Sequence, residues 1–300
     1  MNMRITDNAY RETSLRDIQR IQRDVVKAHK ELITHQRVER PSDDPVAASK
    51  ALHQTSEKRT LSQYAKNNRV ALDAVTESHA SLTEFKDTVL TRAQELSILV
   101  DDISDGNAKE AYLAELNQLI EHGLQVMNTK HRGEYLFSGD SSLTEPFSAV
   151  RSAGGKIISV SYAGSSKARS YDVGEGVHLS PTLDPAQTTQ FSTCFANLIN
   201  LRDAISSGDN NAIDLARSGL LTNETDIVAD LSNLGGKQMR IESAKVFDTA
   251  RYKRLEEGIH GNVDADLAEA STRFKDLSDA LDLAFKIHSH ATSQSILNYL

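Results

Sequence analysis

The sequence predicts a mainly α-helical protein, in which both chain ends form long antiparallel helical hairpins or a coiled coil, with a small inserted β subdomain. Three observations lead to this fold class. The stretches 46–132 and 186–300 contain no proline, so the residue that stops helices most strongly is missing from both. Apolar residues recur there at alternating steps of three and four, as on amphipathic helices. Seven of the fifteen glycines lie between residues 133 and 176, where turns and strands are expected instead.

Composition narrows the class of protein further. The chain of 300 residues has no tryptophan and only 5% aromatic residues, which suits thin helical packing better than a broad core. The net charge of −8 and the pI near 5.7 argue against nucleic acid as a partner, because nucleic acid attracts clustered Lys and Arg. No run of about 18 apolar residues occurs, so no membrane insertion is expected.

The first helix is expected near the N-terminus, where one apolar stripe follows a 3-4-3-4 spacing. Its members are Ile18, Ile21, Val25, Ala28 and Leu32. Residues 1–24 are rich in charge and lack the continuous apolar segment of a signal peptide. They therefore do not resemble a cleaved secretory signal.

A helix-start motif follows at Pro41, Ser42, Asp43, Asp44 and Pro45. Asp44 is a suitable N-cap and Pro45 suits the first helical position. The adjacent carboxylates of Asp43 and Asp44 have no histidine close by in the sequence, and the nearest other acidic residue is Glu39. Helix capping is therefore the preferred interpretation, and acid-base catalysis is not supported.

Two helical hairpins are expected to follow, one on each side of the β subdomain. In the first, a heptad seam over 61–103 is followed by a turn at 105–107 and a second helix from about 113 to 127. The β subdomain should lie at 133–190, with Ile158, Val160 and Tyr162 alternating on one face of a strand. The second hairpin has a turn at 207–210. Gly235 and Gly236 interrupt its pattern, and residues 258–263 read as another turn.

The last helix should run from about residue 264 to the end, with a second apolar stripe at three- and four-residue steps. Its members are Leu267, Ala270, Phe274, Leu277, Leu281 and Ala284. Two stripes of this kind are best covered when the first and last helices wrap around each other and around neighbouring copies. The predicted assembly interface therefore comprises Ile18, Ile21, Val25, Leu32, Leu267, Phe274, Leu277 and Leu281.

These elements predict three domains. Residues 1–40 plus 266–300 form a terminal coiled-coil domain for polymerisation on the inside, 41–132 plus 191–265 form a helical rod, and 133–190 form a β-rich outer domain. Because the β subdomain is inserted, the two helical halves must meet, which brings both termini to one end.

No catalytic, cofactor or metal site is expected. Cys194 is the only cysteine, which excludes an intrachain disulfide and a cysteine metal cluster. It lies beside Phe191 and Phe195, so we expect a small packed side chain. His288 and His290 are two residues apart and point to different sides of a helix, unlike metal-binding pairs.

Several segments resemble one known family. They are residues 3–6 (MRIT), 40–49 (RPSDDPVAAS), 133–139 (GEYLFSG), 263–270 (VDADLAEA) and 295–300 (SILNYL). Together they are similar to the bacterial flagellin superfamily, and within it to members at the junction between hook and filament. The match covers both ends and part of the middle of the chain.

The resemblance implies a structural role in the flagellum and no enzymatic activity. The implied partners are further copies of the chain in a ring or helical layer, the preceding hook-associated protein, flagellin and an export chaperone. It also implies export by the flagellar secretion apparatus to an extracellular position. A filament flagellin and, less well supported, a cytoplasmic coiled-coil scaffold are the alternatives, whereas an enzyme has only acidic pairs and scattered histidines in its favour.

Overall fold

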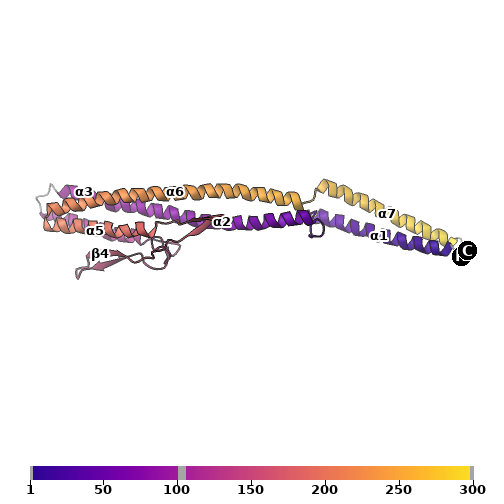
Figure 1. The fold of residues 1–300 in the computed structure, drawn as a ribbon, viewed down its shortest axis with the longest axis horizontal. Helices are drawn as coiled ribbons and strands as arrows, with labels where there is room; N and C mark the ends of the chain where they lie inside the picture. Colours follow the sequence, from indigo (N-terminus) through magenta and orange to yellow (C-terminus); the bar gives the residue numbers. More distant parts are fainter. Residues whose placement is uncertain (1–2, 101–105, 298–300) are drawn as a thin grey trace. The chain divides into compact units, whose positions relative to one another are not determined.

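The computed structural model describes residues 3–100 and 106–297, and the side-chain surroundings of residues 9–100 and 108–290. It consists mainly of helices with small β-hairpins (Figure 1), which confirms the predicted fold class. The chain divides into two compact units. We call Met1–Thr60 with Arg251–Leu300 the terminal unit, and Leu61–Ala250 the middle unit.

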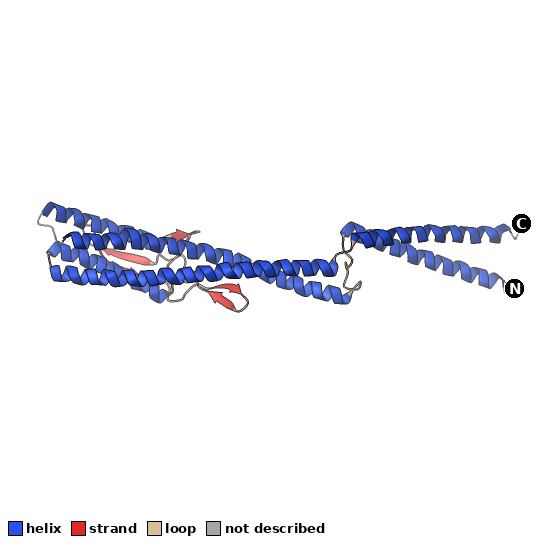
Figure 2. Ribbon diagram, turned by 90° about the horizontal axis from the view of Figure 1, so that it is seen from above, coloured by secondary structure: helices blue, strands red, loops and turns tan. Residues whose placement is uncertain are grey.

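The terminal unit is built around the first and last helices. It contains α1 (Met3–Thr34) and α7 (Leu267–Leu297), together with the beginning of α2 (Pro45–Glu84) and the end of α6 (Asn210–Val263). Figure 2 shows α1 and α7 as an antiparallel pair whose two chain ends lie at the same end. The expected pairing of the first and last helices is therefore present within one chain.

The middle unit contains the remainder of α2 and α6 and the helices between them. These are the π-helical segment η1 (Phe85–Leu90), α3 (Thr91–Leu99), α4 (Gly106–Met127) and α5 (Pro185–Ser207). The turn expected at 207–210 is present, because α5 ends at Ser207 and Gly208 adopts φ 76° before α6 begins. The turn expected at 105–107 begins outside the described residues, and α4 already starts at Gly106.

Phenylalanine rings fill the core of the middle unit. Phe85 contacts Phe191 and Phe195 edge-on, with ring centroids 5.5 and 5.6 Å apart. Phe147 lies 5.9 Å from Phe195 and joins the β-hairpins to this cluster. Gly123 allows α4 to approach η1 closely, because a Cβ atom at this position would lie only 2.9 Å from the ring of Phe85.

Three antiparallel two-stranded hairpins are described between α4 and α5. They are β1 (Lys130–His131) with β2 (Glu134–Tyr135), β3 (Phe147–Arg151) with β4 (Ile157–Tyr162), and β5 (Tyr171–Gly174) with β6 (Val177–Leu179). The predicted alternation in β4 is wrong at one position, because Ile157 is buried and Ile158 is exposed. A bulge explains this: Arg151 pairs with Ile157 but Val150 pairs with Ser159, so the extra residue shifts the phase of the strand.

Two predicted interruptions of α6 are also wrong, since the helix runs unbroken from Asn210 to Val263. Gly235 and Gly236 lie inside it, and the turn expected at 258–263 is displaced to the residues that follow. Gly258 serves close packing in the terminal unit, where a Cβ atom would lie 2.5 Å from the side chain of Gln54. Among the helices described, none is both long and apolar enough to cross a bilayer.

Candidate assembly interface

The stripe predicted on α1 forms the side of the helix that faces α7. Ile18 is 5% exposed and Ala28 is buried, while Ile21, Val25 and Leu32 are half-buried. Because these residues recur at three- and four-residue steps, they share one face of the helix. That face is partly covered within the chain and keeps apolar surface at its edges.

The stripe predicted on α7 is covered less evenly. Phe274, Leu277 and Leu281 are half-buried, and the ring of Phe274 lies 5.6 Å from that of His29 on α1. Leu267, at the first position of the helix, is 45% exposed, and Ala270 one turn later is buried instead. Phe274 therefore contacts α1, Leu277 and Leu281 are half-buried at the next positions of the stripe, and the role of all four α7 residues in assembly stays a prediction.

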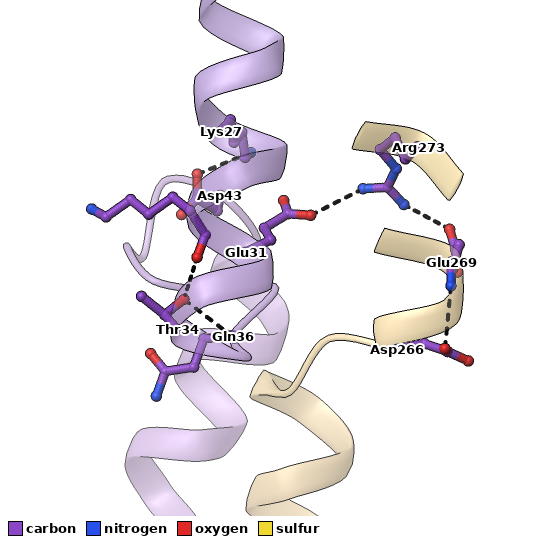
Figure 3. Close-up of polar contacts among 9 residues, drawn as sticks. Lys27, Glu31, Thr34, Gln36, Asp43, Asp266, Glu269 and Arg273 are labelled. Atoms are coloured by element: carbon purple, nitrogen blue, oxygen red, sulfur yellow. Dashed lines mark hydrogen bonds and ion pairs between the residues drawn. The ribbon is translucent and has the colours of Figure 1, made fainter. Parts of the chain in front are cut away.

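Polar contacts fix the register of the two helices. Arg273 on α7 donates to Glu31 on α1 over 3.3 Å and to Glu269 over 2.6 Å (Figure 3). Nearer the chain ends, Ser14 Oγ lies 3.1 Å from His288 Nδ1. Polar groups inside an apolar seam are satisfied in one alignment only, so they specify register more than they add stability.

Sequence reasoning did not identify Glu31 or Arg273, which are 242 residues apart along the chain. The second partner of Arg273, Glu269, does belong to a pattern that is visible in the sequence. Asp266 and Glu269 have the three-residue spacing of a capping pair. In the structure, Asp266 Oδ1 accepts from the backbone N–H groups of Ala268 at 2.8 Å and Glu269 at 3.3 Å, as an N-cap of α7 does.

The two connections that enter and leave the helix pair are bonded to each other. The backbone N–H of Arg37 donates to the carbonyl of Val263 over 2.8 Å, and the N–H of Ala265 donates to the carbonyl of His35 over 3.0 Å. His35 has φ 58°, in the left-handed region that a residue other than glycine adopts rarely. These backbone hydrogen bonds hold the α1–α2 and α6–α7 connections side by side. We call this pair of connections, residues 35–44 and 263–266, the crossing point.

The helix-start motif lies on this crossing point. Asp44 Oδ1 accepts the backbone N–H of Ala47 at 3.0 Å, which places Pro45 at the first position of α2. Asp43 Oδ2 accepts the N–H of Arg40 at 2.9 Å, and Lys27 of α1 lies 3.3 Å from Asp43 Oδ1 (Figure 3). Both aspartates therefore have structural partners.

These partners shift the acidity of both groups. The pKa of Asp43 lies below its usual value because the Arg40 backbone and Lys27 stabilise the carboxylate. The pKa of Asp44 is lowered by the Ala47 backbone and by Arg37, whose guanidinium lies 3.2 Å away. A general base needs the opposite environment, one that raises its pKa toward neutrality.

A second set of apolar side chains points away from the seam. On α1, Leu15, Val26 and Ile33 are exposed, with Val26 at 61% and Ile33 at 67%. Their spacing of eleven and seven residues places them on one line of the helix. On α7, Leu283 and Ile287 are exposed in the same way, four residues apart. Sequence reasoning missed this set because the 3-4 spacing of the inner stripe was the stronger pattern.

Alternative chemistry finds little support in the described residues. Within them, no group of three histidine, cysteine or acidic side chains is placed to hold a metal ion. Cys194 is buried, as predicted, and burial raises the pKa of its thiol to about 12, so the reactive thiolate is suppressed.

Comparisons with known proteins agree with the family resemblance. Residues 5–142 match the bacterial flagellin N-terminal helical region. Flagellar hook-associated protein 3 of Escherichia coli K12 is 29% identical over 148 residues, which cover 49% of this chain and 46% of that protein. Its counterpart in Salmonella typhimurium is 25% identical over 146 residues, which cover 48% of this chain and 46% of that protein. The chain thus spans about half the length of the curated relatives it matches.

A solved structure extends the likeness of the fold. The crystal structure of Bacillus cereus FlgL aligns over 69% of this chain and 99% of its own, with a TM-score of 0.58 and 20% identity. At that identity the match supports a common fold. Together, the three comparisons confirm the resemblance to flagellin-like, hook-associated proteins that the sequence segments indicated.

Proposed function

We propose that this chain is a structural subunit of the bacterial flagellum and acts as the adaptor at the hook–filament junction, on which the flagellin filament assembles. The observation that carries the proposal is the terminal helix pair. Its inner stripe is only partly covered, and large apolar side chains such as Val26, Ile33 and Ile287 remain exposed on its outside. Exposed apolar surface of this kind is typical of an interaction site.

The relatives named hook-associated protein 3 support this role, which is carried over to this chain as part of the proposal. The partners are further copies of the chain in a ring or helical layer, the preceding hook-associated protein and flagellin. The chain leaves the cell through the flagellar secretion apparatus with the help of an export chaperone. A chain with a single cysteine can pass unfolded without breaking a disulfide.

Assembly then completes the fold of the terminal helices. Each exposed apolar side chain that a neighbour covers contributes about 2 kcal/mol. The ordering of long helices costs conformational entropy, which this burial offsets. A subunit that joins a growing layer contacts several neighbours, whereas a subunit in a dimer in dilute solution contacts only one. Subunits should therefore bind to the layer more tightly than they bind to each other in dilute solution.

A double substitution on the outside of the helix pair tests the proposal. Cells that lack the gene should regain filaments from the wild-type copy. The variant with Val26→Asp and Ile287→Asp should fold with a nearly unchanged unfolding temperature, because both side chains are at least half exposed to water in the single chain. It should nevertheless produce no filaments and release flagellin into the medium.

The control is Leu143→Asp, which makes the same kind of change at a side chain that is 82% exposed in the middle unit. This variant should restore filaments fully. Normal filaments from the double variant, or no rescue by the wild-type copy, would contradict the proposal.

A further inference from the structure

A small pocket of the middle unit is lined by α2 and by the hairpins β1–β2 and β5–β6. Its volume of about 50 Å³ has room for a group of a few atoms, since a single water molecule needs only about 10–15 Å³. The polar side chains that line the pocket are His131, Arg132, Glu134, Tyr135, Arg169 and Tyr171. None of them belongs to the predicted assembly interface, so the assembly function does not explain them.

The turn of the first hairpin carries a residue that its backbone disfavours. His131 pairs with Glu134, so Arg132 and Gly133 form a two-residue loop with φ 52° and 85°. Positive φ at both loop positions is a feature of the type I′ turn, in which Asn-Gly is a preferred pair. Arginine in this conformation costs free energy, and its exposed ion pair with Asp73 offsets little of that cost. A role of the Arg132 side chain in the pocket accounts for arginine at this position.

His131 contributes to the pocket an atom that lacks a partner. Its Nε2 atom is fully buried, and among the described residues no group forms a hydrogen bond with it. Buried polar atoms are almost always paired, because an unpaired one costs free energy. In the tautomer with the proton on Nε2, His131 donates to an oxygen atom that enters the pocket. The imidazole therefore favours a ligand that accepts hydrogen bonds.

The two arginines offer further donors, and one of them is held by a ring. A guanidinium has five N–H groups, and Arg132 uses one nitrogen to bind Asp73 while Arg169 uses one to bind Glu134. The Arg169 guanidinium also lies 5.4 Å from the ring centre of Tyr171, in a cation–π contact. Donors that are already ordered lose little entropy when they bind a ligand. Two guanidinium groups in one pocket are typical of a site for a carboxylate or a phosphate.

The charge around the pocket decides between these two anions. Lys130, whose Nζ atom lies 4.4 Å from the ring centre of a tyrosine in the lining, adds a third cation to the two arginines. Together with the carboxylates of Asp73 and Glu134, these groups leave one positive charge. Asp140 and Lys167, hydrogen bonded through their backbones over 2.9 Å, add one charge of each sign. A carboxylate balances this surplus, whereas a phosphate carries nearly two charges at pH 7 and would be repelled by the acidic side chains.

We propose that this pocket binds the carboxylate group of a small organic acid. Arg132 and Arg169 donate to its oxygen atoms, and His131 donates through Nε2. The bound group connects the two hairpins with each other and with α2, so binding stabilises the folded hairpins. The proposal does not depend on the assembly function, because no residue of the predicted assembly interface takes part.

Titration of the full chain with sodium acetate, at an ionic strength kept constant with sodium chloride, tests the proposal. The backbone amide signals of residues 130–135 and 169–171 should shift and saturate, with a dissociation constant on the order of 1 mM for so small a ligand. Acetamide, which has the same shape but no charge, should cause no saturable shift, and sodium phosphate should bind more weakly than acetate. Shifts with acetate that do not saturate, saturation by acetamide, or phosphate binding as tight as that of acetate would overturn the proposal.

Arg132→Asn separates binding from folding. The substitution gives the loop the Asn-Gly pair that such a turn prefers, so the unfolding temperature should stay the same or rise. Acetate binding should weaken by about tenfold or more, because a charged pair of donors is lost. If arginine served only the turn and its ion pair with Asp73, the same variant would unfold at a lower temperature and bind acetate as the wild type does.

Arg151→Asn is the matched control, because Arg151 also lies on a β-hairpin and pairs with a helix carboxylate, that of Glu121, but does not line the pocket. This variant should bind acetate unchanged. His131→Phe keeps a ring at the position and removes the buried nitrogen, so it should weaken acetate binding several-fold while the unfolding transition stays cooperative. Wild-type affinity in both Arg132→Asn and His131→Phe, or an equal loss in Arg151→Asn, would overturn the proposal.

Discussion

The two units of this molecule bury different kinds of side chain. In the middle unit, Phe85, Phe137, Phe147, Phe191 and Phe195 are all fully buried. Among the described side chains of the terminal unit, the buried apolar residues are Ile18, Ala28, Val38, Ala47, Ala48, Ala51 and Ala270. Because alanine removes little apolar area from water, the terminal unit gains much less from burial than the middle unit does.

The difference shows how one chain can separate stability from assembly. The middle unit is stabilised by its own core. The terminal unit is specified by polar contacts, such as the pairing of Arg273 with Glu31 and the crossing of its two connections. Such contacts select a geometry but contribute little net free energy. We therefore expect the terminal helices to be well aligned and only weakly stable until neighbours cover them.

Removal of α7 should show the difference between the two units most clearly. A chain that ends at Ala265 loses the partner of α1, but it keeps the whole middle unit. Its main thermal unfolding transition should shift by less than about 2 °C, while incorporation at the hook tip should be abolished. A chain that ends there and no longer unfolds cooperatively would show that the middle unit depends on the terminal pair.

Truncation of a core ring should have the next largest effect. Phe85→Ala should lower the free energy of unfolding of the middle unit by about 3–5 kcal/mol, because it empties the centre of the ring cluster. Ile18→Ala, a change at a buried site of the terminal unit, should leave that transition unchanged. Chemical denaturation monitored by circular dichroism measures both, and equal losses would remove the distinction between the units.

Replacement of a buried carboxyl group in the middle unit should change the free energy of unfolding by a smaller amount, and it should raise that free energy instead of lowering it. Asp230 is 4% exposed, and burial with the nearby charge of Asp226 raises its pKa to about 6. In the unfolded chain the group titrates near its usual value of 3.8. The folded state therefore holds an extra proton between about pH 4 and pH 6, and stability falls as the pH rises through this window.

Asp230→Asn should remove that dependence. The amide oxygen can still accept the hydrogen bond that Gln187 donates to Asp230 over 2.5 Å. At pH 7 the variant should be more stable by about 1–2 kcal/mol, since a pKa shift of one unit corresponds to about 1.4 kcal/mol. Unfolding curves at pH 4 and pH 7 test this, and a variant that is less stable at both would show that the carboxylate is favourable where it lies.

The smallest expected effect is at the helix-start motif. Asp44→Ala removes the N-cap of α2 and should speed amide exchange in the first turn several-fold. Asp44→Asn keeps an oxygen that can cap. The lowered pKa of Asp44 means that its contribution is present above about pH 4 and is lost as the pH falls through the folded value. The wild type should therefore loosen in acid, while the asparagine variant should not.

Much of the fold was accessible from sequence because it follows local rules. Apolar spacing on Ile18 and Val25 predicted the face of α1 that meets α7, and the turn at 207–210 follows from its glycine and polar residues. The pattern failed where packing overrides local preference. Gly235 and Gly236 weaken a helix locally, yet α6 continues through them, because Ile227, Leu234 and Ile241 bury its inner face.

Other features needed the structure because they depend on distant parts of the chain. The bulge that exposes Ile158 is set by pairing with β3, and the contact between Glu31 and Arg273 depends on the crossing point. The predicted boundaries at 40, 132, 190 and 265 stay a prediction. So does the role of the interface residues in polymer contacts, which a single chain does not display.

Amide hydrogen exchange of the isolated protein, followed residue by residue and repeated on assembled flagella, tests the central claim most directly. In a monomeric sample, residues 9–34 and 267–290 should exchange within seconds to minutes, while buried positions of α4, α5 and α6 in the middle unit resist for hours. On assembly the terminal helices should become as protected as the middle unit. Strong protection of both terminal helices in the monomer would contradict the account, because the pair would then be stable without neighbours.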